Sequence, residues 1–149
     1  MTNILRGVTL YGTASAAGRL STNIGGKTGT TNNYVDALFV GFTANLVVGT
    51  WAGFDDNRPL GYGETGGKTA LPMWIDYMAA AIPKYGAPDF TVPEGVTNIM
   101  VNKETGKPLA PGSGEGFLET FVTGFDPNSD TSAVFDSNTQ GTSSKPLLS

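Results

Sequence analysis

The strongest constraint on the fold is a stretch of 18 residues, 37–54, that contains no charged side chain. A run of that length is long enough for a membrane-spanning helix. Glycine, threonine and asparagine interrupt it, and it is rich in valine and phenylalanine, which favours strands over a spanning helix. Ala44-Asn45 offers a tight connection near its middle. The stretch therefore predicts two antiparallel strands, 34–43 and 46–54.

A third strand precedes these two. Residues 20–31 have the composition of a strand, and short turns separate all three segments. The prediction is an antiparallel three-stranded meander over about 20–54. In residues 38–42 the side chains of both faces are apolar, so we expect the strand 34–43 to be covered on both sides.

Two helices are predicted beside this sheet. Apolar side chains at helical spacing indicate helices over 1–11 and 69–82, each with one face that would pack on the sheet. Thr69 is positioned to cap the second helix, and Pro83 and Gly86 are expected to end it.

The composition of the sequence and its hydrophobic pattern change after the second predicted helix. We expect residues 1–86 to be one portion of a domain and 87–127 a small β-rich extension, with strand-like runs at 97–101 and 117–122. Residues 128–149 are mostly serine, threonine, asparagine and aspartate, which predicts a disordered polar tail. The fold class is therefore α+β.

The residue types in the chain limit its chemistry. The absence of cysteine and histidine excludes cysteine nucleophiles, thiolate zinc sites, Ser-His-Asp triads and histidine-ligated metals. Acid–base chemistry would fall to lysine, aspartate, glutamate or tyrosine. Thirteen acidic residues against nine basic ones give a net charge of -4, without the basic surplus typical of nucleic-acid-binding proteins. We expect no metal ion, no cofactor and no nucleic-acid partner.

A glycine-rich segment, residues 25–31, contains a lysine followed by a threonine. A phosphate-binding loop would need a glycine six positions before Lys27, where this chain has Ser21, and a helix beginning at the lysine, where strands are predicted. Both requirements fail. The sequence Lys27-Thr28-Gly29 matches instead the Lys-Thr-Gly box of serine acyl-enzymes that act on D-alanyl peptides and β-lactams.

The sequence around this box extends the match. The first 82 residues closely resemble the transpeptidase domain of class A penicillin-binding proteins, and the sequence up to residue 127 resembles that family's C-terminal extension more loosely. The resemblance rests mainly on Gly26-Lys27-Thr28-Gly29-Thr30-Thr31-Asn32 and on residues 36–43, 46–55 and 63–68. Residues 4–13 are similar to the helix that precedes the box in the family. The resemblance implies an incomplete penicillin-binding, β-lactamase-like transpeptidase fold.

The resemblance also implies a role for each residue of the box. Lys27 would supply positive charge near the nucleophile and the substrate carboxylate. The hydroxyls of Thr28 and Thr30 would bind the terminal carboxylate of a D-alanyl-D-alanine stem peptide or of a penicillin. Gly29 would let the substrate backbone approach closely. The backbone N–H of Thr30 would be one of two oxyanion-hole donors, so Lys27 and Thr30 are the catalytic residues that we expect.

The family's nucleophile box does not occur in this chain. In that Ser-x-x-Lys box the serine attacks the peptide carbonyl, and no serine here has a lysine three positions later. Residues 65–68 and 142–145 have the spacing with threonine in place of serine. Ser21-Thr22-Asn23 matches the family's Ser-x-Asn box but lies on the same segment as Lys27, so we interpret it as a coincidence. We expect a C-terminal portion of a transpeptidase domain that is inactive alone.

Two other interpretations stay open at this point. A fragment of a serine β-lactamase or D,D-carboxypeptidase would share the Lys-Thr-Gly box, and a non-catalytic extracellular β-rich binding module would explain the missing serine. The favoured interpretation implies three partners: the peptidoglycan stem peptide, β-lactams and the remainder of the parent transpeptidase domain. It also implies a membrane-anchored parent in the cell envelope, at the extracytoplasmic face of the inner membrane, with no membrane span in this chain.

Overall fold

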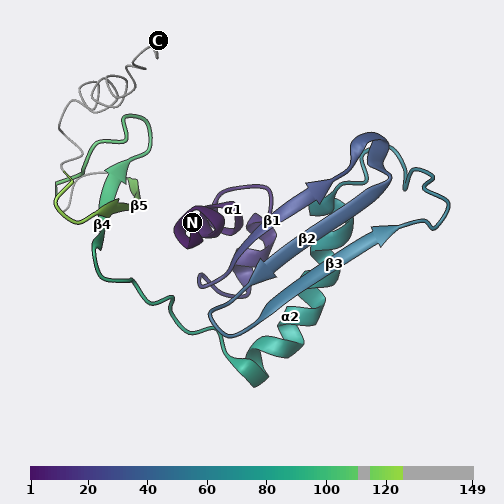
Figure 1. Cartoon of the computed structure of the whole chain (residues 1–149), viewed down its shortest axis with the longest axis horizontal. Helices are drawn as coiled ribbons and strands as arrows, with labels where there is room; N and C mark the ends of the chain where they lie inside the picture. The colour runs from purple at the N-terminus through teal and green to yellow at the C-terminus, as the bar shows by residue number, and fades with distance from the viewer. Residues whose placement is uncertain (111–114, 126–149) are drawn as a thin grey trace, which may run out of the picture. The chain divides into compact units, whose positions relative to one another are not determined.

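The computed structural model describes residues 1–110 and 115–125. It divides the chain into two compact units, Met1–Thr91 and a second that begins at Val92 (Figure 1). The described part of the first unit contains α-helices and a three-stranded sheet, and that of the second contains a two-stranded sheet. The α+β class is thereby confirmed. The predicted disordered tail, 128–149, lies outside the described residues.

The sheet of the first unit is the predicted antiparallel meander. Its strands are β1 (Gly25–Thr30), β2 (Asp36–Phe42) and β3 (Val47–Gly53), and β2 lies in the middle. The first strand begins later than residue 20, because a short 3-10 helix, Ser15–Arg19, precedes it. The N–H of Leu20 closes that helix by bonding to a carbonyl one turn back, so this residue is not extended.

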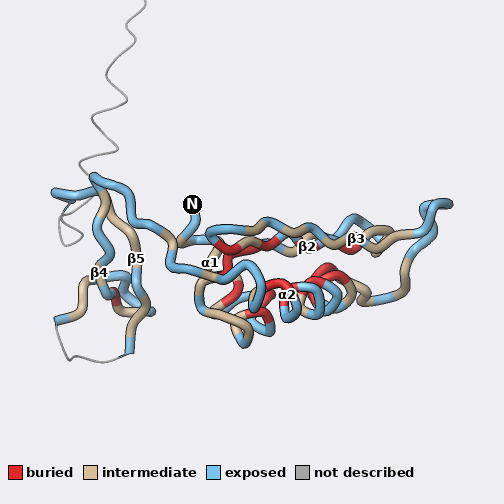
Figure 2. Tube along the Cα trace, turned by 90° about the horizontal axis from the view of Figure 1, so that it is seen from below, coloured by how far each residue is buried: buried red, intermediate tan, exposed pale blue. Residues whose placement is uncertain are grey.

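The core lies between one face of the sheet and the helix α2 (Leu71–Tyr85). Figure 2 shows the sheet edge-on with α2 below it, and buried residues lie between the two. Trp74 of α2 packs edge-to-face on Phe39 of β2, with ring centroids 5.1 Å apart, and its Nε1–H donates to the Val48 carbonyl at 3.0 Å. A side chain at Gly41 would collide with the indole, so glycine at this position lets Trp74 lie directly on the sheet.

The other face of the sheet is exposed, which contradicts the expectation that β2 is covered on both sides. Successive side chains of a strand point to opposite faces. Phe39 faces α2 and is fully buried, whereas Leu38 and Val40 point the other way and are 39% and 41% exposed. Trp51, opposite Leu38 on β3, is 56% exposed. Leu38, Val40 and Trp51 define an open face, because the described part of the first unit buries only one side of its sheet.

The predicted N-terminal helix is confirmed as α1 (Thr2–Leu10). It lies beside β1 in Figure 1. Thr9 of this helix is buried, and its Oγ1 donates to the carbonyl of Ile24, the residue before β1, at 2.6 Å. A threonine hydroxyl therefore joins the helix to the start of the strand.

The second helix continues beyond Pro83, which the sequence pattern predicts to help end it. α2 continues through Pro83 to Tyr85, and Gly86, with a positive φ of 76°, follows its last residue. Proline omits one backbone hydrogen bond, but at this position the omission falls near the helix end. The Gly86 N–H bonds to the Ile82 carbonyl at 2.8 Å and closes the final turn.

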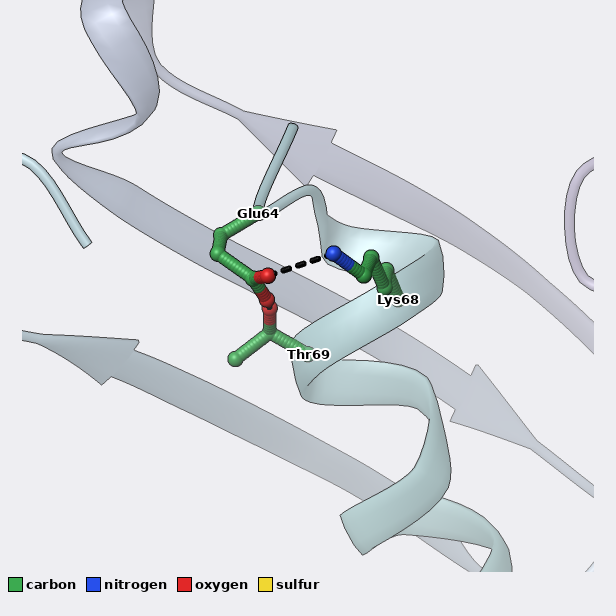
Figure 3. Close-up of polar contacts among 3 residues, drawn as sticks. All are labelled: Glu64, Lys68 and Thr69. Carbon is green, nitrogen blue, oxygen red and sulfur yellow. Dashed lines mark hydrogen bonds and ion pairs between the residues drawn. The ribbon is translucent and has the colours of Figure 1, made fainter. Parts of the chain in front are cut away.

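A π-helical turn, η3 (Gly66–Ala70), leads into α2, so the prediction of a Thr69 cap is wrong. Thr69 Oγ1 instead donates to the carboxylate of Glu64 at 2.7 Å. Lys68 forms an ion pair with the same carboxylate (Figure 3). These bonds, first that from Lys68 and then that from Thr69, hold the pKa of Glu64 below its ordinary value. We call Glu64, Lys68 and Thr69 the Glu64 clasp.

The second unit contains β4 (Val96–Asn102) and β5 (Gly116–Val122), paired antiparallel. Both strands include the runs predicted for the extension. Val101 is buried, and the rings of Phe121 and Phe125 stack with centroids 5.7 Å apart. Within residues 1–110 and 115–125, no helix is both long enough and apolar enough to cross a membrane.

Replacing Trp74 with phenylalanine should destabilise the first unit. The change removes the hydrogen bond to Val48 and leaves a void against Phe39, which together should lower the free energy of unfolding by about 2–3 kcal/mol. Urea denaturation followed by circular dichroism measures this. Tyr77→Phe, on the same helix but 54% exposed, is the matched control and should change the free energy by about 0.5 kcal/mol or less. Equal effects of the two substitutions would contradict the placement of Trp74 in the core.

The Glu64 clasp should make stability sensitive to acid. Because the folded pKa of Glu64 lies below its ordinary value of 4.5, the contribution of the clasp is complete above pH 4.5 and is lost as the pH falls through the folded pKa. The free energy of unfolding of the unmodified chain should therefore fall more steeply below pH 4.5 than that of Glu64→Gln. Lys68→Met, which removes the larger cause, should reduce the slope too. Urea titrations across this pH range measure the slopes, and identical slopes would refute a shifted Glu64.

Candidate functional site

The Lys-Thr-Gly-Thr sequence, residues 27–30, lies on β1, an edge strand of its sheet. N–H groups alternate between the two sides of an antiparallel strand. The N–H of Thr31 donates to the Asp36 carbonyl at the start of β2 at 3.1 Å. The N–H groups of Thr28 and Thr30 consequently point the opposite way, to the edge of β1 that no described strand pairs with. This orientation leaves the Thr30 N–H available to a ligand laid along the edge.

The side chain of Lys27 lies at the same edge. Lys27 is paired with Val40, so it projects on the open face of the sheet, and it is exposed. Its Nζ donates to the Thr28 carbonyl at 2.9 Å. That carbonyl points to the edge with the Thr28 N–H, because the N–H and C=O of one strand residue point the same way. The contact therefore holds a positive charge beside the outward N–H groups.

The two threonine hydroxyls lie on the opposite face of β1. Thr28 and Thr30 alternate with Lys27, which turns their side chains toward the face that η3 and α2 cover. Thr28 Oγ1 is 3.2 Å from Thr13 Oγ1, and Thr30 Oγ1 accepts the Gly66 N–H at 3.0 Å. The Thr30 hydroxyl uses a lone pair in that bond, so its proton can still donate to a ligand.

Gly66 is the site residue that the sequence analysis did not assign. It is buried, and a side chain there would collide with the carbonyl oxygens of Gly29 and Leu38. Only glycine therefore lets η3 lie directly on β1 and β2. The Gly-Gly pair at residues 66–67, directly before a predicted helix, was the available signal. Residues 63–68 carry part of the family resemblance, and Thr65-Gly66-Gly67-Lys68 has the spacing of a nucleophile box, but neither observation predicts a contact with Thr30.

The formal match to the Ser-x-Asn box has a local structural role. Ser21 Oγ accepts the N–H of Asn23 at 3.0 Å, and the Asn23 side chain donates to Asp89 Oδ1 at 2.7 Å and to the Ala87 carbonyl at 3.2 Å. These contacts join the residues before β1 to the segment that follows α2. Residues 142–145, the other threonine-based match to the nucleophile box, lie outside the described residues.

The arrangement suits recognition of an extended, negatively charged peptide end. An edge strand offers outward N–H and C=O groups for pairing with a peptide backbone. Lys27 and the Thr30 hydroxyl add a positive charge and a donor suited to a carboxylate. Across residues 1–110 and 115–125, no cluster of three acidic side chains could hold a metal ion.

No protein-family model matches the chain. Among curated proteins, penicillin-binding protein 1A of Aquifex aeolicus is 41% identical over 136 residues, which cover 89% of this chain and 18% of that protein. Penicillin-binding protein 1A of Haemophilus influenzae is 44% identical over 106 residues, which cover 70% of this chain and 12% of that protein.

A crystal structure agrees with these sequence matches. Penicillin-binding protein 1A from Haemophilus influenzae superposes with a TM-score of 0.72 and 36% sequence identity, covering 86% of this chain and 20% of that one. The chain thus spans no more than about a fifth of the proteins that it matches. With the resemblance confirmed in both sequence and fold, this chain belongs to the penicillin-binding protein family, as a segment similar to part of penicillin-binding protein 1A.

Proposed function

We propose that the chain supplies one wall of the active site of a peptidoglycan D,D-transpeptidase that is inhibited by penicillins. In this function the edge of β1 binds the D-alanyl-D-alanine end of a stem peptide during cell-wall cross-linking. The observation that carries the proposal is the outward Thr30 N–H beside the Lys27 ammonium, on a strand edge that no described strand pairs with. We propose Lys27 and the Thr30 N–H as the catalytic groups.

The roles proposed for these two groups follow from charge and direction. Attack on a peptide carbonyl places negative charge on its oxygen, and an N–H that points away from the sheet can donate to that oxygen. Lys27 contributes a positive charge at the same edge, near both the developing charge and the substrate carboxylate. The attacking serine belongs to polypeptide outside this chain, because no Ser-x-x-Lys sequence occurs here.

The residues proposed for substrate binding are Thr28, Gly29 and Thr30. Gly66 fixes the position of the Thr30 hydroxyl oxygen through a 3.0 Å hydrogen bond, which supports a donor role for its proton. A side chain on Gly29 would crowd Leu38 on the face where Lys27 projects. Because Gly29 has no side chain, a peptide can approach the strand edge closely on that face.

The open face supports the proposed partner, the remainder of the transpeptidase domain. Lys27 projects from the face that carries Leu38, Val40 and Trp51. Exposed apolar groups of this size favour contact with another protein surface. A nucleophile-bearing part packed there would cover these side chains and would bring its serine to the side of the sheet where the ammonium lies.

The similarity to penicillin-binding protein 1A also bears on the other interpretations. Identities of 38% and more over most of the chain favour a transpeptidase over a β-lactamase, a carboxypeptidase or a non-catalytic module. We also propose that the parent acts in the cell envelope, at the extracytoplasmic face of the inner membrane to which it is anchored. Peptidoglycan stem peptides and β-lactams are its proposed ligands.

A fluorescent penicillin tests whether acylation needs a serine from outside this chain. The 149-residue chain alone should form no covalent adduct, because it lacks the serine nucleophile. A chimera in which the chain replaces the matching segment of the Haemophilus influenzae protein should be labelled. Gel fluorescence after denaturation measures the adduct. Labelling of the chain alone would reveal a nucleophile that we have not assigned, and an unlabelled, folded chimera would refute the proposed function.

Substituting Lys27 in that chimera tests the role of its charge. Lys27→Gln should slow acylation by the penicillin about a hundredfold, because it removes an electrostatic contribution to the transition state. The side chain is exposed, so the thermal midpoint should stay unchanged. Lys84→Gln removes another exposed lysine, on α2, and should label at the rate of the unmodified chimera. Equal rates for the two variants would exclude Lys27 from the reaction.

A further inference from the structure

The Glu64 clasp lies on the segment that contacts β1 from the side opposite Lys27. Its carboxylate accepts hydrogen bonds from Lys68 and from Thr69, and both side chains belong to η3 (Figure 3). The same turn begins with Gly66, whose N–H donates to Thr30 Oγ1 at 3.0 Å. One short segment therefore connects a partly exposed polar cluster to a hydroxyl on the strand edge.

This turn needs external contacts to keep its conformation. π-helical turns are rare, and adjacent glycines have much conformational freedom to lose. At its C-terminal end, η3 is held by Thr50 of β3, whose Oγ1 donates to the Ala70 carbonyl at 2.9 Å. At its N-terminal end, the clasp connects Glu64, which precedes the glycines, to residues that follow them. The glycine pair is thus enclosed between the two sides of the clasp.

We propose that the Glu64 clasp is a positioning device for Thr30. By closing the turn around Gly66 and Gly67, it keeps the Gly66 N–H on Thr30 Oγ1, which occupies a lone pair and directs the hydroxyl proton to the substrate carboxylate. The inference rests on the proposed function of the β1 edge. Glu64, Lys68 and Thr69 are positioning residues in this account, because none of them lies on the edge itself.

The exposure of the ion pair supports this role over a purely stabilising one. The side chains of Lys68 and Glu64 are 62% and 31% exposed, and an ion pair with one exposed partner adds only modestly to the stability of a protein. A small free-energy difference is enough to favour one conformation of a glycine-rich turn over the others. In the selected conformation Gly66 lies directly against the carbonyls of Gly29 and Leu38, and its N–H reaches Thr30 Oγ1.

Amide hydrogen exchange in the full 149-residue chain tests the connection directly. Thr69→Val keeps the shape of the side chain and removes its hydroxyl, Glu64→Gln removes the charge, and Thr69→Ser keeps the hydroxyl. The Gly66 amide should exchange about tenfold faster in the first two variants, as expected for a weakened hydrogen bond, and at the normal rate in Thr69→Ser. The Thr43 amide, bonded to the Leu46 carbonyl in the β2–β3 turn, should be unaffected throughout.

The controls separate positioning from stability. Asp56→Asn breaks the exposed ion pair with Arg58 and should leave Gly66 exchange unchanged. An unchanged Gly66 amide in both Thr69→Val and Glu64→Gln would overturn the inference, and so would equal acceleration at Gly66 and Thr43. If Thr69→Val fails to fold, Glu64→Gln decides by the same criterion.

The penicillin-labelled chimera supplies the functional readout. Thr69→Val should slow acylation about tenfold at an unchanged thermal midpoint, and Thr69→Ser should restore the rate. If the unmodified chimera is labelled and Thr69→Val reacts equally fast, the inference fails and the proposed function stands. If the folded, unmodified chimera is not labelled, the proposed function fails, and the role in substrate binding fails with it.

Discussion

The packing of Trp74 on the middle strand is the contact on which the rest of the first unit depends. The indole lies against Phe39 and over Gly41, and its N–H bonds to the carbonyl of Val48 on the neighbouring strand. One side chain thus attaches α2 to both β2 and β3. Because η3 continues directly into α2, the same attachment also determines where Gly66 meets β1.

One face of β1 is covered by η3 and the other is open, and this difference explains how the candidate site is arranged. Alternation along the strand sends Lys27 to the open face and the Thr28 and Thr30 side chains to the face covered by η3. The backbone groups between them point to the unpaired edge. A positive charge, a fixed hydroxyl and outward N–H groups therefore lie along the edge of one strand. Neighbouring residues of an edge strand can bind one ligand even though their side chains lie on opposite faces of the sheet.

Much of this arrangement could be predicted from local patterns. The strand-forming composition of residues 37–54, its interruption by glycine and polar residues, and the short turns indicated the meander, and apolar spacing indicated both helices. The local pattern predicts the length of α2 less well, because Pro83 suggests a stop although it lies in a final turn that can lose one hydrogen bond. The residue type of Thr69 suits a cap, but a carboxylate five residues earlier competes for its hydroxyl. Local propensity does not include such partners.

The sequence alone determined that one predicted strand carries a lysine, two threonines and a glycine in the pattern of the family's Lys-Thr-Gly box, with no serine at the spacing of the family's nucleophile box. It also indicated the family, since the segments that flank the box are far more specific than the three-residue box itself. Only the tertiary structure decided that the Thr30 N–H faces the outer edge of β1 and that Gly66 supports the Thr30 hydroxyl. The physical reason is that these properties depend on strand register and on contacts between residues 36 positions apart, which hydrophobic periodicity does not encode.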